Sequence, residues 1–157
     1  FRRVLFRSAT ATQAPDPARI VPHVNDLLAE DVREGTFVTA FVGILDPRTG
    51  TLDYASAGHG PILAFAAADG SVAEHPTHGT PLGLFPGMDY DPPTRLVLLP
   101  GDMLLLFTDG FIEWAREDGE QFGTERLTEV VRSHAAAPAA EIIAAVTAAV
   151  EIGRAHV

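Results

Sequence analysis

The chain of 157 residues contains no cysteine and no lysine. Without cysteine it has no disulfide framework, no thiolate metal site and no cysteine nucleophile. No apolar run reaches the roughly 18 residues that a membrane span needs, and the apolar part of the N-terminal stretch FRRVLFRS is too short for a secretory signal. These absences predict a soluble, cytoplasmic protein without a membrane span.

Positive charge is scarce in the body of the chain. All 11 basic side chains are Arg, and they face 21 acidic residues. Four of the Arg and one Glu lie in the two end segments, so residues 9–150 carry about 13 net negative charges. So acidic a body is a poor candidate for binding nucleic acid or an anionic membrane. Acid excess suits metal ions better, although its commonest cause is plain solubility.

Both ends of the chain are predicted to be non-native. Residues 1–8 (FRRVLFRS) and 151–157 (EIGRAHV) resemble translated sequencing-adapter DNA, and they supply neither a continuing strand nor a cap. Residues 9–16 form an Ala-, Pro- and Thr-rich linker. Residues 17–150 remain as one domain-sized unit without repeats, and we expect the natural chain to have been cut on both sides.

The first half of this unit predicts a helix followed by a hairpin. Apolar residues at helical spacing favour a helix over about 17–32, with Pro22 leaving its start open between residues 17 and 22. Residues 37–45 are β-branched and aromatic, 46–50 (DPRTG) form a turn, and 51–56 alternate as a returning strand.

The second half predicts two more strand pairs and then helices. Residues 62–66 and 72–75 are separated by the turn AADG, and residues 95–99 and 103–107 are joined by Pro-Gly-Asp. Connections this short favour antiparallel pairing within each pair. Helical spacing follows at Leu127, Val130 and Val131 and again over about 139–150. Strands first and helices later predict an α+β architecture rather than a parallel βαβ sheet.

The segment Thr108-Asp109-Gly110 is the first candidate for chemistry. It follows MLLLF, a strand that is apolar on both faces and is therefore predicted to be buried. A carboxylate at the end of such a strand must be paired, hydrogen-bonded or bound to metal, because burying an isolated charge costs several kcal/mol. The alternative is an ordinary Asp-Gly turn as the chain leaves the sheet.

A second candidate is the turn at Gly58 and His59, where two glycines let the backbone bend and present one His at a strand end. A lone His in a turn is more often structural than catalytic. The loop at residues 79–83 (GTPLG) holds no titratable group, and a packing role is favoured for it. The remaining His show no zinc spacing, and the chain has no GxSxG, P-loop or GxGxxG motif.

The order of these motifs resembles the SpoIIE/RsbU-type branch of the metal-dependent (PPM, type 2C) protein phosphatases. The resemblance covers about residues 20–135 and rests on FVTA, ILDPRTGTLDYASAGHGP, GTPLGL, LLPGD and LLLFTDGFIEWAREDGEQFGTERL. It implies a serine/threonine phosphatase with two stacked antiparallel β-sheets flanked by helices. It also implies two Mn²⁺ or Mg²⁺ ions held by aspartates at one edge, with Asp109 of the TDG motif as a metal ligand.

The same resemblance implies metal-assisted hydrolysis, in which two ions share and activate a water. No catalytic residue is assigned beyond Asp109, and Gly110, Gly58 and His59 are candidates for the site edge. Glu113 either supports the metal ligands or lies on the surface. The usual substrates in this branch are phosphorylated anti-sigma-factor antagonists of the STAS type, and sensory domains commonly lie upstream.

The sequence departs from the family in two places. No match to the upstream aspartate motifs precedes Phe37, and the acid-pair segment expected after the last helix is absent where EIGRAHV begins. The expectation is therefore a partial phosphatase domain that is inactive as this chain. A catalytically dead phosphatase-like module that binds a partner protein remains the main alternative, and an unrelated α+β ligand-binding domain is the third.

Overall fold

The computed structural model describes residues 15–33, 35–75, 77, 79–108 and 123–155, the last five by their backbone. Two antiparallel sheets of three strands each form the centre of the fold. In chain order the described elements are α1 (Pro17–Asp31), β1 (Ala40–Asp46), β2 (Thr51–Ala57), β3 (Ile62–Phe65), β4 (Val72–His75), β5 (Thr94–Val97), β6 (Met103–Leu106), α3 (Gly123–Ser133) and α4 (Ala139–Ala155). The predicted α+β fold with two antiparallel sheets is confirmed.

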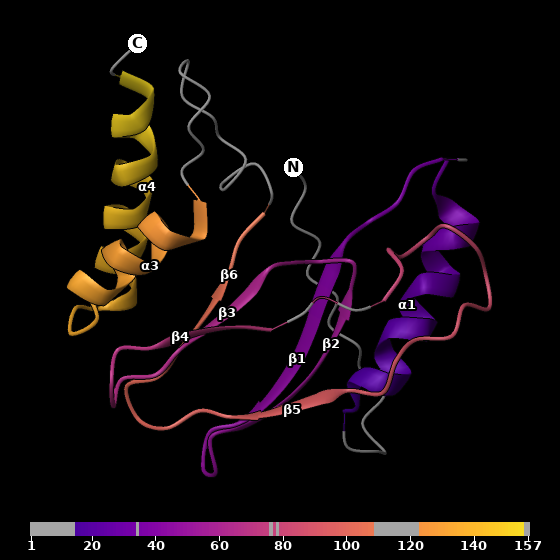
Figure 1. Ribbon diagram of the computed structural model, residues 1–157. Helices are drawn as coiled ribbons and strands as arrows, with labels where there is room; N and C mark the ends of the chain where they lie inside the picture. Colours follow the sequence, from indigo (N-terminus) through magenta and orange to yellow (C-terminus); the bar gives the residue numbers. More distant parts are fainter. Residues whose placement is uncertain (1–14, 34, 76, 78, 109–122, 156–157) are drawn as a thin grey trace.

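The elements form four layers, with α1 on one side of the sheets and α3 and α4 on the other (Figure 1). The first sheet has the order β1-β2-β5 and the second β4-β3-β6. The apolar cluster between α1 and the first sheet contains the buried residues Val21, Ala55, Ala57 and Leu82. The cluster between the sheets is built on Leu52, Tyr54 and Ile62. The cluster under α3 and α4 contains Leu63, Phe65, Leu127, Val131, Ile142 and Val146.

Alternation along the central strands explains these layers. In β2, Leu52 and Tyr54 point between the sheets, whereas Ala55 and Ala57 lie in the cluster under α1. In β3, Ile62 lies between the sheets and Leu63 packs toward α3 and α4. Successive residues of a strand face opposite sides of the sheet. A strand that is covered on both faces therefore needs apolar residues at successive positions, not only at alternate ones.

Helix α1 begins at the earlier of the two predicted starts. Asp16 caps it by accepting a hydrogen bond from the backbone N of Ala18 at 2.9 Å, and Pro17 occupies the first turn, where its missing N–H costs nothing. Pro22 lies inside the helix. The helix ends at Asp31, and the N–H of Val32 still donates to the carbonyl of Leu28 at 2.8 Å.

The predicted pairing of the strands around Pro100 is wrong. β5 pairs with β2 in the first sheet and β6 pairs with β3 in the second, so the short connection crosses between the sheets. Asp102 holds this crossing, because its carboxylate accepts hydrogen bonds from the N–H groups of Leu99 and Ala67, each at 2.9 Å. A side-chain carboxylate thus supplies the contacts that a hairpin ladder would otherwise supply.

Strand β6 is also less buried than predicted. It lies at the edge of the second sheet, its residues are half-buried, and the Leu106 side chain is 43% exposed. An edge strand is flanked by a neighbour on one side only, which explains the difference. Helix α4 continues to Ala155, past residue 150 where the sequence predicts the domain to end. Within the described part of the chain, no helix is long and apolar enough to cross a membrane.

Candidate functional site

The turn between β2 and β3 carries the chain from the first sheet to the second. It contains Gly58 and His59, and a cis peptide bond precedes Pro61. Ile62, the first residue of β3, pairs with Leu106, the last residue of β6. The chain therefore leaves β6 at the same end of the sheet at which the His59 turn enters β3. Two of the predicted site regions therefore lie at the same end of the second sheet. They are the turn at Gly58 and His59 and the segment after β6, which the structure describes up to residue 108.

Three predicted site residues, Asp109, Gly110 and Glu113, lie outside the described residues. Their roles stay predictions. Gly58 and His59 are described, and the geometry of their turn can be built from its contacts.

Ser56, the next-to-last residue of β2, holds the His59 turn through two hydrogen bonds. Its hydroxyl donates to the carbonyl O of His59 at 2.7 Å and accepts from the N–H of His59 at 3.1 Å. One hydroxyl therefore satisfies both backbone groups of His59, which fixes the backbone at the bend. The sequence prediction did not include Ser56. A Ser that precedes a turn residue by three positions can hydrogen-bond the backbone of that residue, and this spacing is the pattern that could have indicated Ser56.

Two glycines allow the turn to pack closely against the loop at residues 79–83. Gly58 has φ +69°, and a Cβ on it would lie 2.9 Å from Cγ of Pro81. Gly79 has φ +95°, and a Cβ there would lie 2.5 Å from the carbonyl O of Ser56. Leu82 of the same loop is buried and pairs with Val38. The packing role predicted for this loop is confirmed.

Gly79→Ala is expected to lower the free energy of unfolding by about 2–3 kcal/mol, from backbone strain at positive φ plus the clash with Ser56. Gly87→Ala is the matched control, because Gly87 also has positive φ, +68°, but a Cβ there meets nothing within 4 Å. That control should cost about 1 kcal/mol. Urea denaturation of both variants measures the difference, and equal losses would show that the contact with Ser56 contributes nothing.

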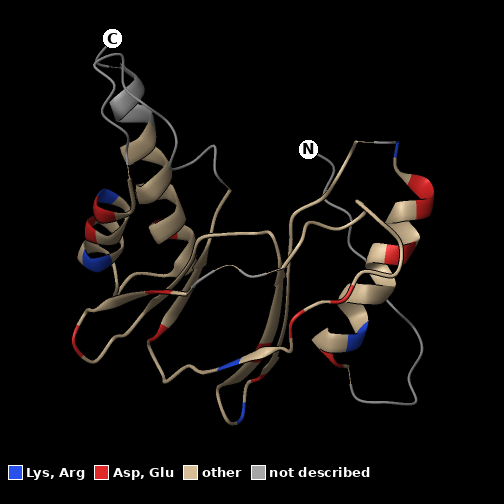
Figure 2. Ribbon diagram, turned by 45° about the vertical axis from the view of Figure 1, so that its right-hand side comes forward, with Lys and Arg blue, Asp and Glu red and all other residues tan. Residues whose placement is uncertain are grey.

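The described residues do not form a metal site by themselves. No group of three or more His, Asp or Glu side chains among them is placed to hold a metal ion. Among the described residues, basic positions are few and scattered over α1 and the segment that follows it, the β1–β2 hairpin, β5 and α3 (Figure 2). An ion pair joins the edge strand β5 to the central strand β2 of the first sheet: Arg95 of β5 donates to both carboxylate oxygens of Asp53 on β2, at 2.6 and 2.8 Å.

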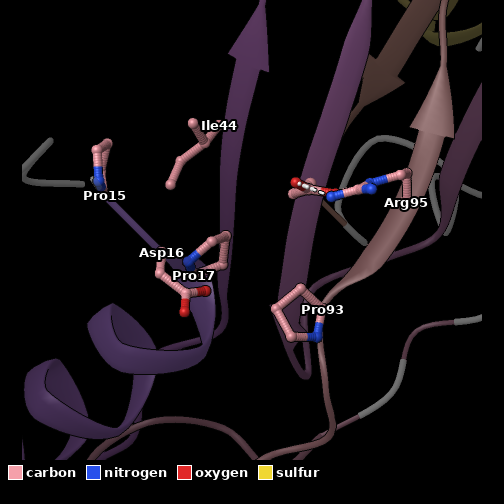
Figure 3. A pocket seen from close by; sticks show the side chains of 7 residues that line it. Pro15, Asp16, Pro17, Ile44, Pro93 and Arg95 are labelled. Atoms are coloured by element: carbon pink, nitrogen blue, oxygen red, sulfur yellow. Dashed lines mark hydrogen bonds and ion pairs between the residues drawn. The ribbon is translucent and has the colours of Figure 1, made fainter. Parts of the chain in front are cut away.

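An open pocket of about 480 Å³ lies between the start of α1 and the first sheet. Figure 3 shows Pro15, Asp16 and Pro17 on one side and Pro93 and Arg95 on the other. The hydrogen bond from Arg95 holds the pKa of the exposed Asp53 carboxyl below its usual value. Arg95 and Asp53 thus neutralise each other's charge. None of the residues that line the pocket belongs to the site predicted from sequence.

Asn25 is a buried polar residue that the sequence prediction missed. It is 0% exposed in α1, and its amide joins the helix to the loop at residues 83–90. Its Nδ2 donates to the carbonyl of Phe85 at 2.9 Å, and its Oδ1 accepts from the N–H of Gly83 and the hydroxyl of Tyr90, each at 3.0 Å. Burial, with a smaller contribution from nearby Asp26, raises the pKa of Tyr90. The sequence does indicate that Asn25 is buried, because it follows Val21 by four residues and therefore lies on the same, buried face of α1.

The sequence matches the family described as Stage II sporulation protein E (SpoIIE) over residues 2–156. The chain belongs to the SpoIIE family. The predicted resemblance to the SpoIIE/RsbU branch of the PPM-type phosphatases is confirmed, since a relative named as the phosphoserine phosphatase RsbU and two solved structures point the same way. PP2C-type phosphatases use divalent metals, and the family is one of signalling proteins.

Two curated relatives of this SpoIIE-family chain are longer proteins. Protein IcfG of Synechocystis sp. is 30% identical over 111 residues, which are 70% of this chain and 17% of IcfG. Phosphoserine phosphatase RsbU of Bacillus subtilis is 27% identical over 127 residues, 81% of this chain and 37% of RsbU. The chain therefore spans well under half the length of either relative.

Two solved structures share the fold. The SiaA-PP2C domain of Pseudomonas aeruginosa superposes with a TM-score of 0.70 at 28% identity, covering 86% of this chain and 53% of that one. The structure of the RsbU and RsbW domains of Rv1364c from Mycobacterium tuberculosis gives a TM-score of 0.59 at 31% identity, covering 82% of this chain and 34% of that one. The architecture described here is thus that of part of a PP2C-like domain.

Proposed function

We propose that this chain is part of a protein serine/threonine phosphatase that hydrolyses phosphoserine or phosphothreonine on a regulatory protein. The observation that carries the proposal is the SpoIIE-family match over residues 2–156, supported by the relative named as a phosphoserine phosphatase. The structure adds that the end of β6 and the His59 turn lie at the same end of the second sheet. A substrate of the STAS anti-sigma-factor-antagonist type, a sensory domain upstream and a cytoplasmic location belong to the same proposal.

The proposed site takes two divalent ions, Mn²⁺ or Mg²⁺, with Asp109 as one ligand. Such ions activate a bound water and neutralise phosphoryl oxygens, and carboxylate oxygens are the ligands they prefer. The role of the described residues is positional. Ser56 fixes the backbone of His59, and Gly58 lets that turn pack against Pro81 beside the end of β6.

A catalytically dead module that binds a partner protein is the second candidate. It is the alternative that the sequence leaves open, because the family's upstream aspartate motifs find no match before Phe37. The two candidates differ in whether a longer chain of the same gene supplies further acidic ligands. Their presence would favour the enzyme, and their absence would favour the binding module.

The 157-residue chain alone is expected to bind Mn²⁺ no more tightly than a generic surface carboxylate does, and to release no phosphate from a phosphoserine peptide above background. The reason is ligand count, because one identified aspartate does not hold two ions. Calorimetric titration with Mn²⁺ and a phosphate-release assay measure both properties, with a longer chain of the same gene as the positive comparison. Two tight Mn²⁺ sites on residues 9–150 would contradict the proposal that the site is incomplete.

A further inference from the structure

The loop at residues 79–83 connects the helix α1 to the end of β2. At the start of the loop, Gly79 lies so near the carbonyl O of Ser56 that a Cβ on it would be 2.5 Å away. At the end of the loop, the buried Gly83 donates its N–H to Oδ1 of Asn25 in α1 at 3.0 Å. The two ends of one five-residue segment are thus held by elements that lie far apart in the sequence.

The backbone of Gly83 also lies directly on the helix. Its φ is +85°, and a Cβ on it would be 3.1 Å from Cγ2 of Val32 and 3.4 Å from Cβ of Leu28. Asn25 beside it is 0% exposed, so water does not readily replace the bond from the Asn25 amide to this backbone. The end of the loop is therefore fixed to α1 by close packing and by a buried hydrogen bond.

Between its two ends the loop has little freedom. Pro81 has a fixed φ, and its ring packs against the turn after β2, where a Cβ on Gly58 would lie 2.9 Å from Cγ of Pro81. Leu82 is 2% exposed, its N–H donates to the carbonyl of Val38 at 2.8 Å, and its carbonyl accepts from the N–H of Val38 at 3.0 Å. So short and restrained a segment transmits a displacement of one end to the other instead of absorbing it.

We infer that Asn25 sets the position of the His59 turn through this loop, so that α1 and the turn shift together. Asn25 holds Gly83, the loop carries the restraint to Gly79, and Ser56, which Gly79 touches, holds both backbone groups of His59. This coupling is a property of the fold and does not require phosphatase activity. Its consequence for the site, that Asn25 is a positioning residue, rests on the proposed function.

The competing restraint on the loop is its pair of bonds to Val38. Val38 is 40% exposed and forms an isolated bridge with Leu82 outside the strands, so water competes for these bonds. The bond from Asn25 to Gly83 is buried and has no such competitor. Asn25 is therefore expected to be the stronger of the two anchors.

Amide hydrogen exchange of the 157-residue chain, followed by nuclear magnetic resonance, tests the coupling. The reporter is the N–H of His59, and the reference is the N–H of Gly50, which bonds to the carbonyl of Asp46 at 2.8 Å in the turn before β2. Asn25→Ala should raise the ratio of the His59 rate to the Gly50 rate at least about tenfold, the effect of losing one good hydrogen bond from a local opening reaction. Ser56→Ala removes the acceptor of the His59 N–H and gives the upper limit of that ratio.

Tyr90→Phe is the matched control for Asn25→Ala. It removes the hydroxyl that donates to Asn25 at 3.0 Å and leaves the bond from Gly83 to Asn25 in place, so the ratio should stay within about twofold. An equal rise of the ratio in both variants would overturn the inference. An unchanged ratio in Asn25→Ala would overturn it too, because Val38 alone would then hold the loop.

Exchange in the unsubstituted chain provides a second measurement, which holds even if Asn25→Ala does not fold. Rates measured over a series of low urea concentrations give the opening free energy of each N–H and its dependence on urea. The N–H groups of His59 and Gly83 should share both values, because the turn and the loop end open as one unit. Different values for these two groups would show that they open separately and would overturn the inference.

Discussion

If a longer chain of the same gene supplies further acidic ligands, as the phosphatase proposal requires, Asp109→Asn in that chain is expected to lower turnover at least about a hundredfold. The substitution keeps the size of the side chain and removes the negative charge that helps to hold a divalent cation. Added Mn²⁺ should restore part of the rate, and stability should change little. Steady-state kinetics across a Mn²⁺ titration measures both effects.

His59→Ala is the comparison for that experiment. The backbone of His59 is held by Ser56, and the residue is proposed to shape the turn rather than to bind metal. Its substitution should therefore cost less activity than Asp109→Asn at every Mn²⁺ concentration. An Asp109→Asn enzyme with unchanged turnover at limiting Mn²⁺ would remove Asp109 from the site.

Asn25→Ala is expected to lower the free energy of unfolding by about 3 kcal/mol. It removes the partners of the Phe85 carbonyl, the Gly83 N–H and the Tyr90 hydroxyl together. Each buried polar group left without a partner costs about 1–3 kcal/mol, offset in part where water can reach it. Urea denaturation of the 157-residue chain measures the loss.

Two further variants serve as comparisons for the loss of stability measured with Asn25→Ala. Tyr90→Phe removes one hydrogen bond to Asn25 and should cost about 1 kcal/mol. His23→Ala lies on the exposed side of the same helix and should change stability by no more than about 0.5 kcal/mol. If Asn25→Ala were no more destabilising than His23→Ala, the amide would not be the anchor of the loop at residues 83–90.

Local signals in the sequence predicted most of the elements. The turn DPRTG and the alternation on either side of it predicted the β1–β2 hairpin, and Asp46 does pair with Thr51 across it. The pairing of strands that lie far apart in the sequence could not be predicted from such local signals. β5 pairs with β2, with Val97 opposite Thr51, and nothing local distinguishes that partner from β6. A Pro-Gly turn fits a crossing between sheets as well as a hairpin.

The candidate site was predictable only where a motif carries it. The order of motifs around Gly58, His59 and Asp109 identified the family, because those residues stand in recognisable short patterns. Contacts such as that of Ser56 with His59 depend on how the turn closes, and they emerge only with the fold. The pairing of Arg95 with Asp53 spans 42 positions and follows from a strand order that the sequence pattern predicted wrongly, since it paired residues 95–99 with residues 103–107.

The most direct test of the phosphatase proposal is phosphate release from a phosphoserine protein by a longer chain of the same gene, measured with Mn²⁺ and again after chelation. The proposal predicts release that depends on the divalent metal, disappears on chelation and returns when Mn²⁺ is restored. Binding of the phosphoprotein without any metal-dependent release would contradict it and would leave the dead binding module as the function of this fold.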